Sequence, residues 1–333
     1  MRNSFYTAGF SEVMHEVKQD PREASYIYTT TACNSPHRGL SAAIGPALFG
    51  TVKSVRALGV QLADSTGGDP DGPSPMDLAL TGIASCGVTT LLGGGSAREL
   101  IFDGIEMLIE YGAPDGEPGQ AVRCRLSVDG VTDEPLMNEL VEQMQTYSPN
   151  MATMIRPVPI SFDCLVGTDE STRRQLTVEA EPITDRRPAA CRVRWVSGTQ
   201  LVSYPNGRRM LRVDQPKQLT GVDWGPNPQE YLLMGLAADV ADQLGRVAYR
   251  LTGERHLWEV STSACEDMRG LLLKERDVVF LQGVTCRVVV PETLRAETGV
   301  EKILTAALAQ SEVRDLVSRS NPGGVSLVLG REG

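Results

Sequence analysis

The chain has 333 residues, of which 41% are hydrophobic and 22% are charged, and its 42 acidic residues against 32 basic ones give a net charge of -10. This composition predicts a soluble globular protein, and the length favours two domains. The acidic excess makes nucleic acid a poor partner. Because no apolar run approaches ~18 residues, we expect no membrane span. The N-terminus, MRNSFYTAGFSEVMHEVKQD, carries charges where a signal peptide is apolar, which favours a cytoplasmic location.

Cysteine usage gives no sign of a metal or a disulfide framework. The seven cysteines are odd in number and show neither a CxxC motif nor another metal-ligand spacing. The simplest interpretation is a set of reduced thiols, most of them in the core. There is also no strand followed by a phosphate-binding, glycine-rich loop. We therefore expect neither a metal nor another cofactor.

Taken in chain order, the predicted elements of each half are strands, a long helix, further strands, a helix and a closing strand, which is not the alternation of a parallel doubly wound sheet. Residues 1–22 form an extension, and strands are expected at 24–33 and 54–64. An apolar helix beginning near residue 74 precedes a strand at 123–130, an amphipathic helix at 134–147 and a strand at 158–166. In the second part, a hairpin at 191–214 turns at Pro205-Asn206-Gly207, and a second apolar helix begins near residue 227. A strand at 278–290, a helical stretch over 292–318 and a strand at 325–330 follow. This order is typical of an α+β fold.

Two segments of the chain repeat each other. Residues 72–86 read GPSPMDLALTGIASC and residues 225–239 read GPNPQEYLLMGLAAD, with six of fifteen positions identical and an offset of 153. An offset of that size is close to one domain. We therefore predict an extension (1–22), a first domain (23–167), a polar linker (168–190) and a second, homologous domain (191–333).

Each repeated segment has the pattern of a helix start. Ser74 and Asn227 are suited to cap a helix, proline follows each, and Asp77 and Glu230 stand at the third helical position, as in a capping box. Capping is therefore the simplest role of both acids, with catalysis as the alternative. The helices that follow are apolar nearly all round, which indicates burial on every side. Cys86 lies about three turns into the first helix, so a neighbouring cation or donor is needed to activate its thiol.

On these residues the sequence resembles the osmotically inducible protein C and organic hydroperoxide resistance (OsmC/Ohr) family. GPSPMDLALTGIASC matches the pattern that opens its central helix, and VRWVSG…SYPNGRRMLRVD resembles the N-terminal strands of a smaller branch. The resemblance covers roughly residues 25–166 and 190–330. It implies two OsmC-like domains, with curved antiparallel sheets around two buried central helices, folded as a single-chain pseudo-dimer. It leaves open a monomer or a homo-oligomer of pseudo-dimers.

Members of this family reduce organic hydroperoxides with a reactive cysteine, and a second cysteine resolves the sulfenic acid. The resemblance places Cys86 at the reactive position of the first half and Asp239 at that of the second half. The resolving position falls at Ser148 in the first half and near Ser318 or Ser320 in the second. Neither half thus has a resolving cysteine in the expected place.

An arginine and a glutamate assist the reaction in this family. The glutamate position corresponds to Asp77, or to Met76 in another branch, and the arginine corresponds to Arg38 or Arg56. Asp239 is expected to pair with a cation such as Arg246 or Arg209, or to face a pocket. We also expect an apolar pocket near the interface, with substrate-binding candidates at Ser148, Asp239, Trp224, Tyr231 and His37.

Three functions remain open from the sequence. Cys86 can reduce a hydroperoxide, in which case an external thiol, or Cys33, Cys124 or Cys164, must return the sulfenic acid to the thiol. It can instead act as the nucleophile of a hydrolase, lyase or transferase on a carbonyl or alkene electrophile, with His37 as a candidate base. The third possibility is a binding protein without turnover. In each case the expected partner is a small, apolar molecule.

Overall fold

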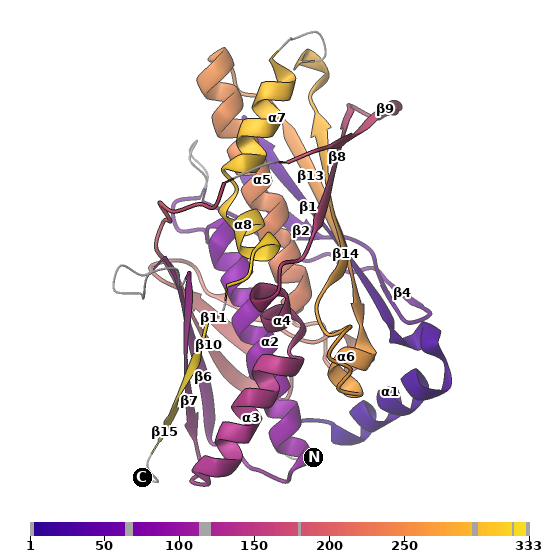
Figure 1. Ribbon diagram of the computed structural model, residues 1–333, viewed down its shortest axis with the longest axis vertical. Helices are drawn as coiled ribbons and strands as arrows, with labels where there is room; N and C mark the ends of the chain where they lie inside the picture. The colour runs from indigo at the N-terminus through magenta and orange to yellow at the C-terminus, as the bar shows by residue number, and fades with distance from the viewer. Residues whose placement is uncertain are drawn as a thin grey trace.

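The computed structural model describes residues 3–63, 69–112, 121–178, 181–294, 299–321 and 323–330. Two long helices, α2 (Pro75–Ala97) and α5 (Pro228–Thr252), run through the middle of the molecule, and a sheet lies on either side of the pair (Figure 1). The other helices are α1 (Thr7–Gln19), α3 (Glu134–Tyr147), α4 (Pro149–Ile155), α6 (Met268–Leu272), α7 (Val300–Ala309) and α8 (Glu312–Ser318). Short 3₁₀ turns lie at Pro21–Ala24, Lys217–Leu219 and Glu292–Leu294. The fold is α+β, as the sequence predicts.

Two mixed sheets contain all the described strands. The nine-stranded sheet follows the order β4-β3-β1-β13-β14-β8-β9, with β2 paired to β1 and β5 paired to β2. Its strands are β1 (Ser25–Ser35), β2 (Gly39–Ile44), β3 (Ala47–Phe49), β4 (Val52–Ser54), β5 (Gly59–Gln61), β8 (Ile160–Val166), β9 (Asp169–Leu176), β13 (Trp258–Asp267) and β14 (Gln282–Val290). The six-stranded sheet follows the order β12-β11-β10-β6-β7-β15. Its strands are β6 (Gly104–Tyr111), β7 (Val122–Asp129), β10 (Ala189–Ser197), β11 (Gln200–Pro205), β12 (Leu211–Val213) and β15 (Val325–Leu329).

Each sheet takes strands from both halves of the chain. Antiparallel pairing joins β1 to β13 from Ser25 opposite Asp267 to Asn34 opposite Trp258, and it joins β10 to β6 in the other sheet. Parallel pairing joins β14 to β8 and β15 to β7. Because both sheets are completed across the halves, one continuous apolar core fills the space between the sheets and the two central helices.

The two central helices begin with the same local structure. Ser74 Oγ accepts from the Asp77 amide at 3.2 Å, and the Asp77 carboxylate accepts from the Ser74 amide at 2.8 Å. Asn227 and Glu230 make the same reciprocal pair at 2.8 and 2.9 Å. Both predicted capping boxes are therefore confirmed, and each satisfies backbone donors that a helix start leaves unpaired.

Close contact between α2 and α5 depends on two glycines. A β-carbon on Gly82 would lie 2.5 Å from the carbonyl oxygen of Pro228, and one on Gly235 would lie 2.8 Å from the amide nitrogen of Ala79. Both distances are shorter than non-bonded contact, so only glycine allows the helices to approach this closely. The repeat at these positions is thus a packing requirement of the helix pair.

Helix α2 is long and apolar enough, by length and composition, to cross a membrane, although the sequence analysis expected no such segment. Of its most apolar 18-residue window, 78% is buried inside the molecule. Burial between α5 and the six-stranded sheet accounts for its apolar composition, as in the core helix of a globular protein.

Several predicted elements match the structure and others differ from it. The helix expected at 134–147 is α3. The turn expected at Pro205-Asn206-Gly207 is present and joins β11 to β12, but the single strand expected before it is two strands, β10 and β11, because the chain also turns at Gly198. The expected linker begins with an ordered edge strand, β9, whose mostly exposed positions explain its polar sequence. The helical stretch expected over 292–318 is broken at Ser311, which caps α8. Strand β6 was missed, although its residues alternate between buried and half-buried positions.

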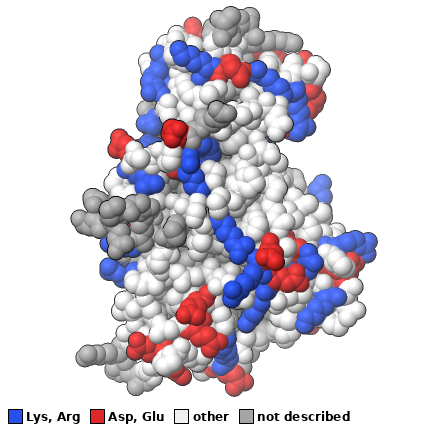
Figure 2. Space-filling model, in the orientation of Figure 1, with Lys and Arg blue, Asp and Glu red and all other residues white. Residues whose placement is uncertain are grey.

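Charged side chains of both signs are interspersed on the face shown in Figure 2. Acidic side chains occur there in several groups, next to lysine and arginine side chains. The net charge of -10 is therefore not gathered into a single acidic patch on this face.

Candidate functional site

A cavity of about 450 Å³ extends from Cys86 toward the N-terminal helix. Helix α2 contributes Cys86 and the turns that follow it, α3 contributes one wall, and α1 together with Phe5 closes another. Most of the lining is apolar: Phe5, Phe10, Met14, Leu140, Met144, Leu219, Leu271 and Leu272. The described polar lining includes Gln215, Gln229, Glu266, Gln143, Tyr147 and Lys274. A cavity of this size and composition suits a small, mainly apolar molecule.

Cys86 lies at the buried part of this cavity, with 3% of its surface exposed. The Gln229 side chain approaches its sulfur, with Nε2 at 3.8 Å from Sγ. Burial raises the pKa of the Cys86 thiol to about 12, although the Ser148 hydroxyl and the Asn150 amide both favour the thiolate. At neutral pH Cys86 is therefore a thiol, and any reaction that uses its sulfur as a nucleophile needs a proton acceptor.

Glu266, near the end of β13, lines the same cavity and is fully buried. The Tyr28 hydroxyl donates to Glu266 Oε2 at 2.7 Å, whereas Oε1 makes no hydrogen bond within the described part of the chain. Burial raises the pKa of Glu266 to about 7, against the opposing effect of the Tyr28 hydrogen bond. A carboxyl group with that pKa can both accept and donate a proton near neutral pH.

Other buried polar atoms around Cys86 also lack partners. Gln229 Oε1 and Thr89 Oγ1 line the cavity and, like Glu266 Oε1, make no hydrogen bond to any described residue. Buried polar atoms in native proteins are nearly always paired, and an exception calls for an explanation. Three such atoms at one cavity indicate a place where a bound molecule supplies the missing partners.

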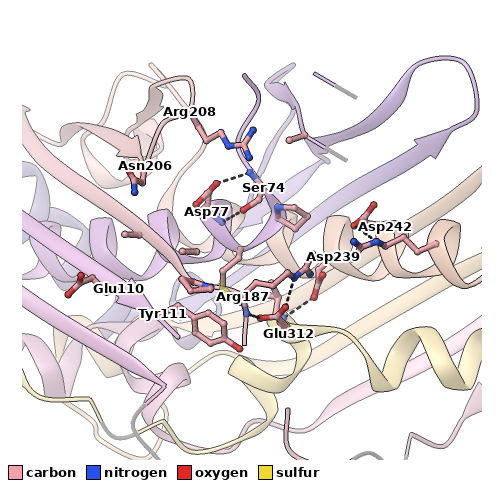
Figure 3. A pocket seen from close by; sticks show the side chains of 18 residues that line it. Ser74, Asp77, Glu110, Tyr111, Arg187, Asn206, Arg208, Asp239, Asp242 and Glu312 are labelled. Carbon is pink, nitrogen blue, oxygen red and sulfur yellow. Dashed lines mark hydrogen bonds and ion pairs between the residues drawn. The ribbon is translucent and has the colours of Figure 1, made fainter. Parts of the chain in front are cut away.

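A second cavity, of about 540 Å³, lies at the equivalent place in the other half of the molecule (Figure 3). An offset of 153 relates Cys86 of the first cavity to Asp239 of the second, and Gln229 of the first to Met76 of the second. The Asp239 carboxylate accepts from Ser311 Oγ at 2.7 Å, much as Ser148 faces Cys86. The two cavities thus contain residues that correspond to each other in the sequence repeat.

Asp239 differs in its partners from what the sequence suggests. Its Oδ2 atom accepts from Ser311 Oγ and from the Val313 amide at 2.9 Å. Neither expected cation pairs with it, because Arg246 lies 3.9 Å from Asp242 and Arg209 pairs with Asp69 at 2.7 Å. Burial raises the pKa of Asp239 to about 6, and the carboxyl group lines the second cavity, which was one of the expected alternatives.

Several other predicted site residues lie away from Cys86. His37 and Arg38 are exposed in the turn between β1 and β2 and do not line its cavity. Arg56 forms an ion pair with the buried Glu230 instead. The positions of His37, Arg38 and Arg56 therefore do not support a catalytic role beside Cys86.

The aromatic candidates and Asp77 also lie outside the cavity at Cys86. Tyr231 is buried and donates to the Arg212 carbonyl at 2.8 Å, while the Arg212 guanidinium lies over the ring of Trp224. Neither aromatic ring lines the cavity at Cys86. Asp77 caps α2 and lines the second cavity, where Asp239 lies.

Ser148 is the predicted residue that the structure brings next to Cys86, and it stands at the N-cap position of α4 without a capping hydrogen bond from its side chain. Its counterpart in the second half is Ser311, which caps α8, and not Ser318 or Ser320 as expected. The sequence analysis expected one helical stretch over 292–318 and placed the serine at its end, whereas α7 ends at Ala309 and Ser311 follows it directly.

Gln229 and Glu266 were missed by the sequence analysis. Both come from the second half of the chain, whereas Cys86 comes from the first, so no local spacing connects them. The repeat offers one signal: Gln229 stands at the position of Met76, where the family carries its glutamate in one branch. The side chain beside each reactive position thus comes from the opposite half.

Two mixed sheets enclose two capped, buried helices, and this α+β arrangement is consistent with an OsmC-like fold. Residues 68–163 match the family model described as OsmC-like protein, a range that runs from before α2 into β8. That range forms one OsmC-like domain and includes Cys86 and Ser148. A search of curated proteins finds no match.

Proposed function

We propose that the protein is a cysteine-dependent peroxidase that reduces small, apolar organic hydroperoxides with an external thiol. The observation that carries this proposal is the shared cavity of Cys86 and Glu266, in which a buried thiol and a carboxyl group with a pKa of about 7 face one apolar space. The OsmC-like match over the segment that contains Cys86 supports the same class of reaction.

In the first step, the Glu266 carboxylate accepts the thiol proton as Cys86 Sγ attacks the terminal oxygen of the hydroperoxide. The O–O bond breaks, Cys86 becomes a sulfenic acid, and the alkoxide takes the proton from Glu266 to leave as an alcohol. Glu266 is thus returned to its starting form. Gln229 Oε1 can accept the hydrogen bond of the hydroperoxide O–H group, and the unpaired Thr89 hydroxyl can donate to a peroxide oxygen.

Recovery of the thiol needs a reductant from outside the chain. Cys86 is the sole cysteine among the described residues that line the cavity, and Cys33, Cys124 and Cys164 lie on strands. A first external thiol condenses with the sulfenic acid, forming a mixed disulfide and releasing water. A second external thiol then displaces Cys86 and leaves as a disulfide.

The proposal includes the origin of the two halves. We infer that the second half is a further OsmC-like domain produced by tandem duplication, and that the chain folds as a pseudo-dimer. Three observations support this inference: the matched capping boxes, the correspondence of Cys86 and Asp239 in the sequence repeat, and the two cavities that these residues line.

One observation favours a second candidate function. Lys274 is the sole lysine or arginine among the described residues lining the cavity, so no guanidinium is placed there to stabilise a thiolate or a departing alkoxide. Addition of the Cys86 thiol to an alkene activated by a carbonyl group releases no alkoxide, because the negative charge spreads over an enolate. In that reaction Sγ bonds to the β-carbon, and Glu266 carries the thiol proton to the α-carbon.

The two candidates are separated by peptide mapping after a short pulse of cumene hydroperoxide. We expect a fast gain of one oxygen, or an adduct with added thiol, confined to Cys86. The rate should rise as the pH passes through about 7, since Glu266 acts as its carboxylate. It should fall by roughly 10²-fold or more in Glu266→Gln. Cys124→Ser is the matched control, because Cys124 is an equally buried cysteine outside the cavity. In this variant Cys86 should be oxidised at the wild-type rate.

If Cys86 stays unmodified under this pulse, the peroxidase proposal is wrong. Labelling of Cys86 by an α,β-unsaturated ketone under the same conditions, with no oxidation by the peroxide, identifies the addition reaction instead. Lack of reaction with either reagent leaves a binding protein without turnover as the function.

A further inference from the structure

The second cavity carries more negative than positive charge. Its described lining holds the carboxyl groups of Asp77, Glu110, Asp239, Asp242 and Glu312, and the guanidinium groups of Arg187, Arg208 and Arg246. Five acids thus face three bases. Around this cluster, Pro75, Met76 and Val313 supply apolar walls.

The cations of this cavity are already engaged. Arg187 Nε lies 2.8 Å from Glu312 Oε1, an ion pair that Figure 3 shows beside Asp239. Arg246 pairs with Asp242 at 3.9 Å, and Arg208 donates to the Pro70 carbonyl. Asp239 makes hydrogen bonds to neutral donors but no ion pair with a described residue. Its carboxyl group, like that of Asp77, is a buried acid of this cavity without an ion pair to a described residue, and the charges of Arg187 and Arg314 act on it only from a longer distance.

A second feature points to a bound molecule. Tyr111, at the end of β6, is 1% exposed and lines the cavity, and its hydroxyl makes no hydrogen bond to any described residue. In Figure 3 the hydroxyl is directed toward the space beside Glu312. A buried hydroxyl without a partner is costly, so a ligand atom that pairs with it is favourable.

We propose that the second cavity binds a small organic ammonium ion. Its ammonium group forms an ion pair with Asp239 and donates a hydrogen bond to the Tyr111 hydroxyl oxygen, while its carbon skeleton packs against Met76 and Val313. An ammonium ion supplies the positive charge that the excess of carboxylates favours and the donors that Asp239 and Tyr111 can accept. The cavity volume of about 540 Å³ accommodates a carbon skeleton as well as the charged group.

The test uses 2-phenylethylamine as the probe and 2-phenylethanol, its uncharged analogue, as the control ligand. Two methionines report on the two cavities separately, because Met76 lines the second cavity and Met144 lines the first. In protein carrying ¹³C-labelled methionine methyl groups, the amine should shift the Met76 signal in a saturable way and leave Met144 unmoved. The alcohol should bind at least about tenfold more weakly.

Variants locate the charge recognition. Asp239→Asn should weaken amine binding about tenfold or more, and Cys86→Ser, a change in the other cavity, should leave it as in the wild type. Tyr111→Phe, which keeps the ring in the core, should weaken binding severalfold even if Asp239→Asn does not fold. A Met76 signal that does not respond, equal binding of the alcohol, or unchanged binding in Tyr111→Phe would overturn the proposal. Because Cys86→Ser abolishes peroxide reduction but spares this site, failure of one proposal is distinguishable from failure of the other.

Discussion

The Glu266→Gln variant tests whether ionisation of buried Glu266, the proposed proton carrier, lowers the free energy of unfolding. Glu266 is fully buried, and its charge faces an apolar cavity with one hydrogen bond, from Tyr28. Folding raises its pKa from 4.5 to about 7, so protonation favours the folded state. The protein should therefore lose stability as the pH rises from about 4.5 to about 7, and the loss should level off above that range. Glutamine has nearly the same shape, can accept the Tyr28 hydrogen bond and never ionises.

The size of the effect follows from linkage. With pKa values of 4.5 in the unfolded chain and about 7 in the folded protein, Glu266 alone lowers the free energy of unfolding by on the order of 2.5 kcal/mol between pH 5 and pH 8. Glu266→Gln should remove that decline. The difference in stability between variant and wild type should thus grow in favour of the variant by on the order of 2.5 kcal/mol over the same range.

Urea unfolding at pH 5 and pH 8 measures this difference, and comparison with the wild type cancels the other titrating groups. Glu259→Gln is the matched control, because Glu259 lies exposed on the same strand and carries no burial cost. A pH-independent difference between Glu266→Gln and wild type would show that Glu266 ionises normally. It would also remove the basis for its role as a proton carrier near neutral pH.

Three further substitutions test the packing, the buried ion pair and the divergence of the cavities. Gly82→Ala should destabilise the protein by about 1–3 kcal/mol in urea unfolding, because its β-carbon would meet the α5 backbone, whereas Gly93→Ala on the same helix has only a 3.7 Å contact and should not. Arg56→Ala should cost about 3–5 kcal/mol of stability, since it leaves a buried carboxylate unpaired, while the rate of Cys86 oxidation in folded protein stays unchanged. Asp239→Cys should give a thiol that peroxide leaves unoxidised in peptide mapping, because Glu312 and Asp242, the carboxyl groups near position 239, are held in ion pairs with Arg187 and Arg246.

The local elements of this fold could be predicted from the sequence, but their assembly could not. Capping boxes at Ser74 and Asn227, the helix at 134–147 and the turn at Pro205-Asn206-Gly207 are all set by neighbouring residues, and each is confirmed. The pairing of β1 with β13 joins positions more than 200 residues apart. Neither the hydrophobic periodicity nor a turn residue identifies β13 as the partner of β1. Alternation of buried and exposed residues is compatible with any neighbouring strand.

The candidate site shows the same division. Cys86 and Ser148 belong to one half and could be identified through the family resemblance. Gln229 and Glu266 come from the other half. Their local sequence predicts only a residue at a helix start for Gln229 and a strand residue for Glu266, with no sign of a site. Arg38 and Arg56 were chosen because the family uses an arginine, yet packing places Arg38 in solvent and pairs Arg56 with Glu230.

A fused pair of homologous halves allows the two cavities to carry different residues although the helices and sheets around them are alike. In a dimer of identical chains, one substitution changes both cavities at once, whereas in a fused pair each position can change alone. Under the proposed duplication, the first cavity keeps Cys86 and gains Gln229 from the second half, while the second cavity holds Asp239 opposite Met76 of the first half. Each cavity therefore depends on residues of both halves. Loss of the cysteine at position 239 cannot have made the second half dispensable, because that half still supplies Gln229 and Glu266 to the remaining thiol.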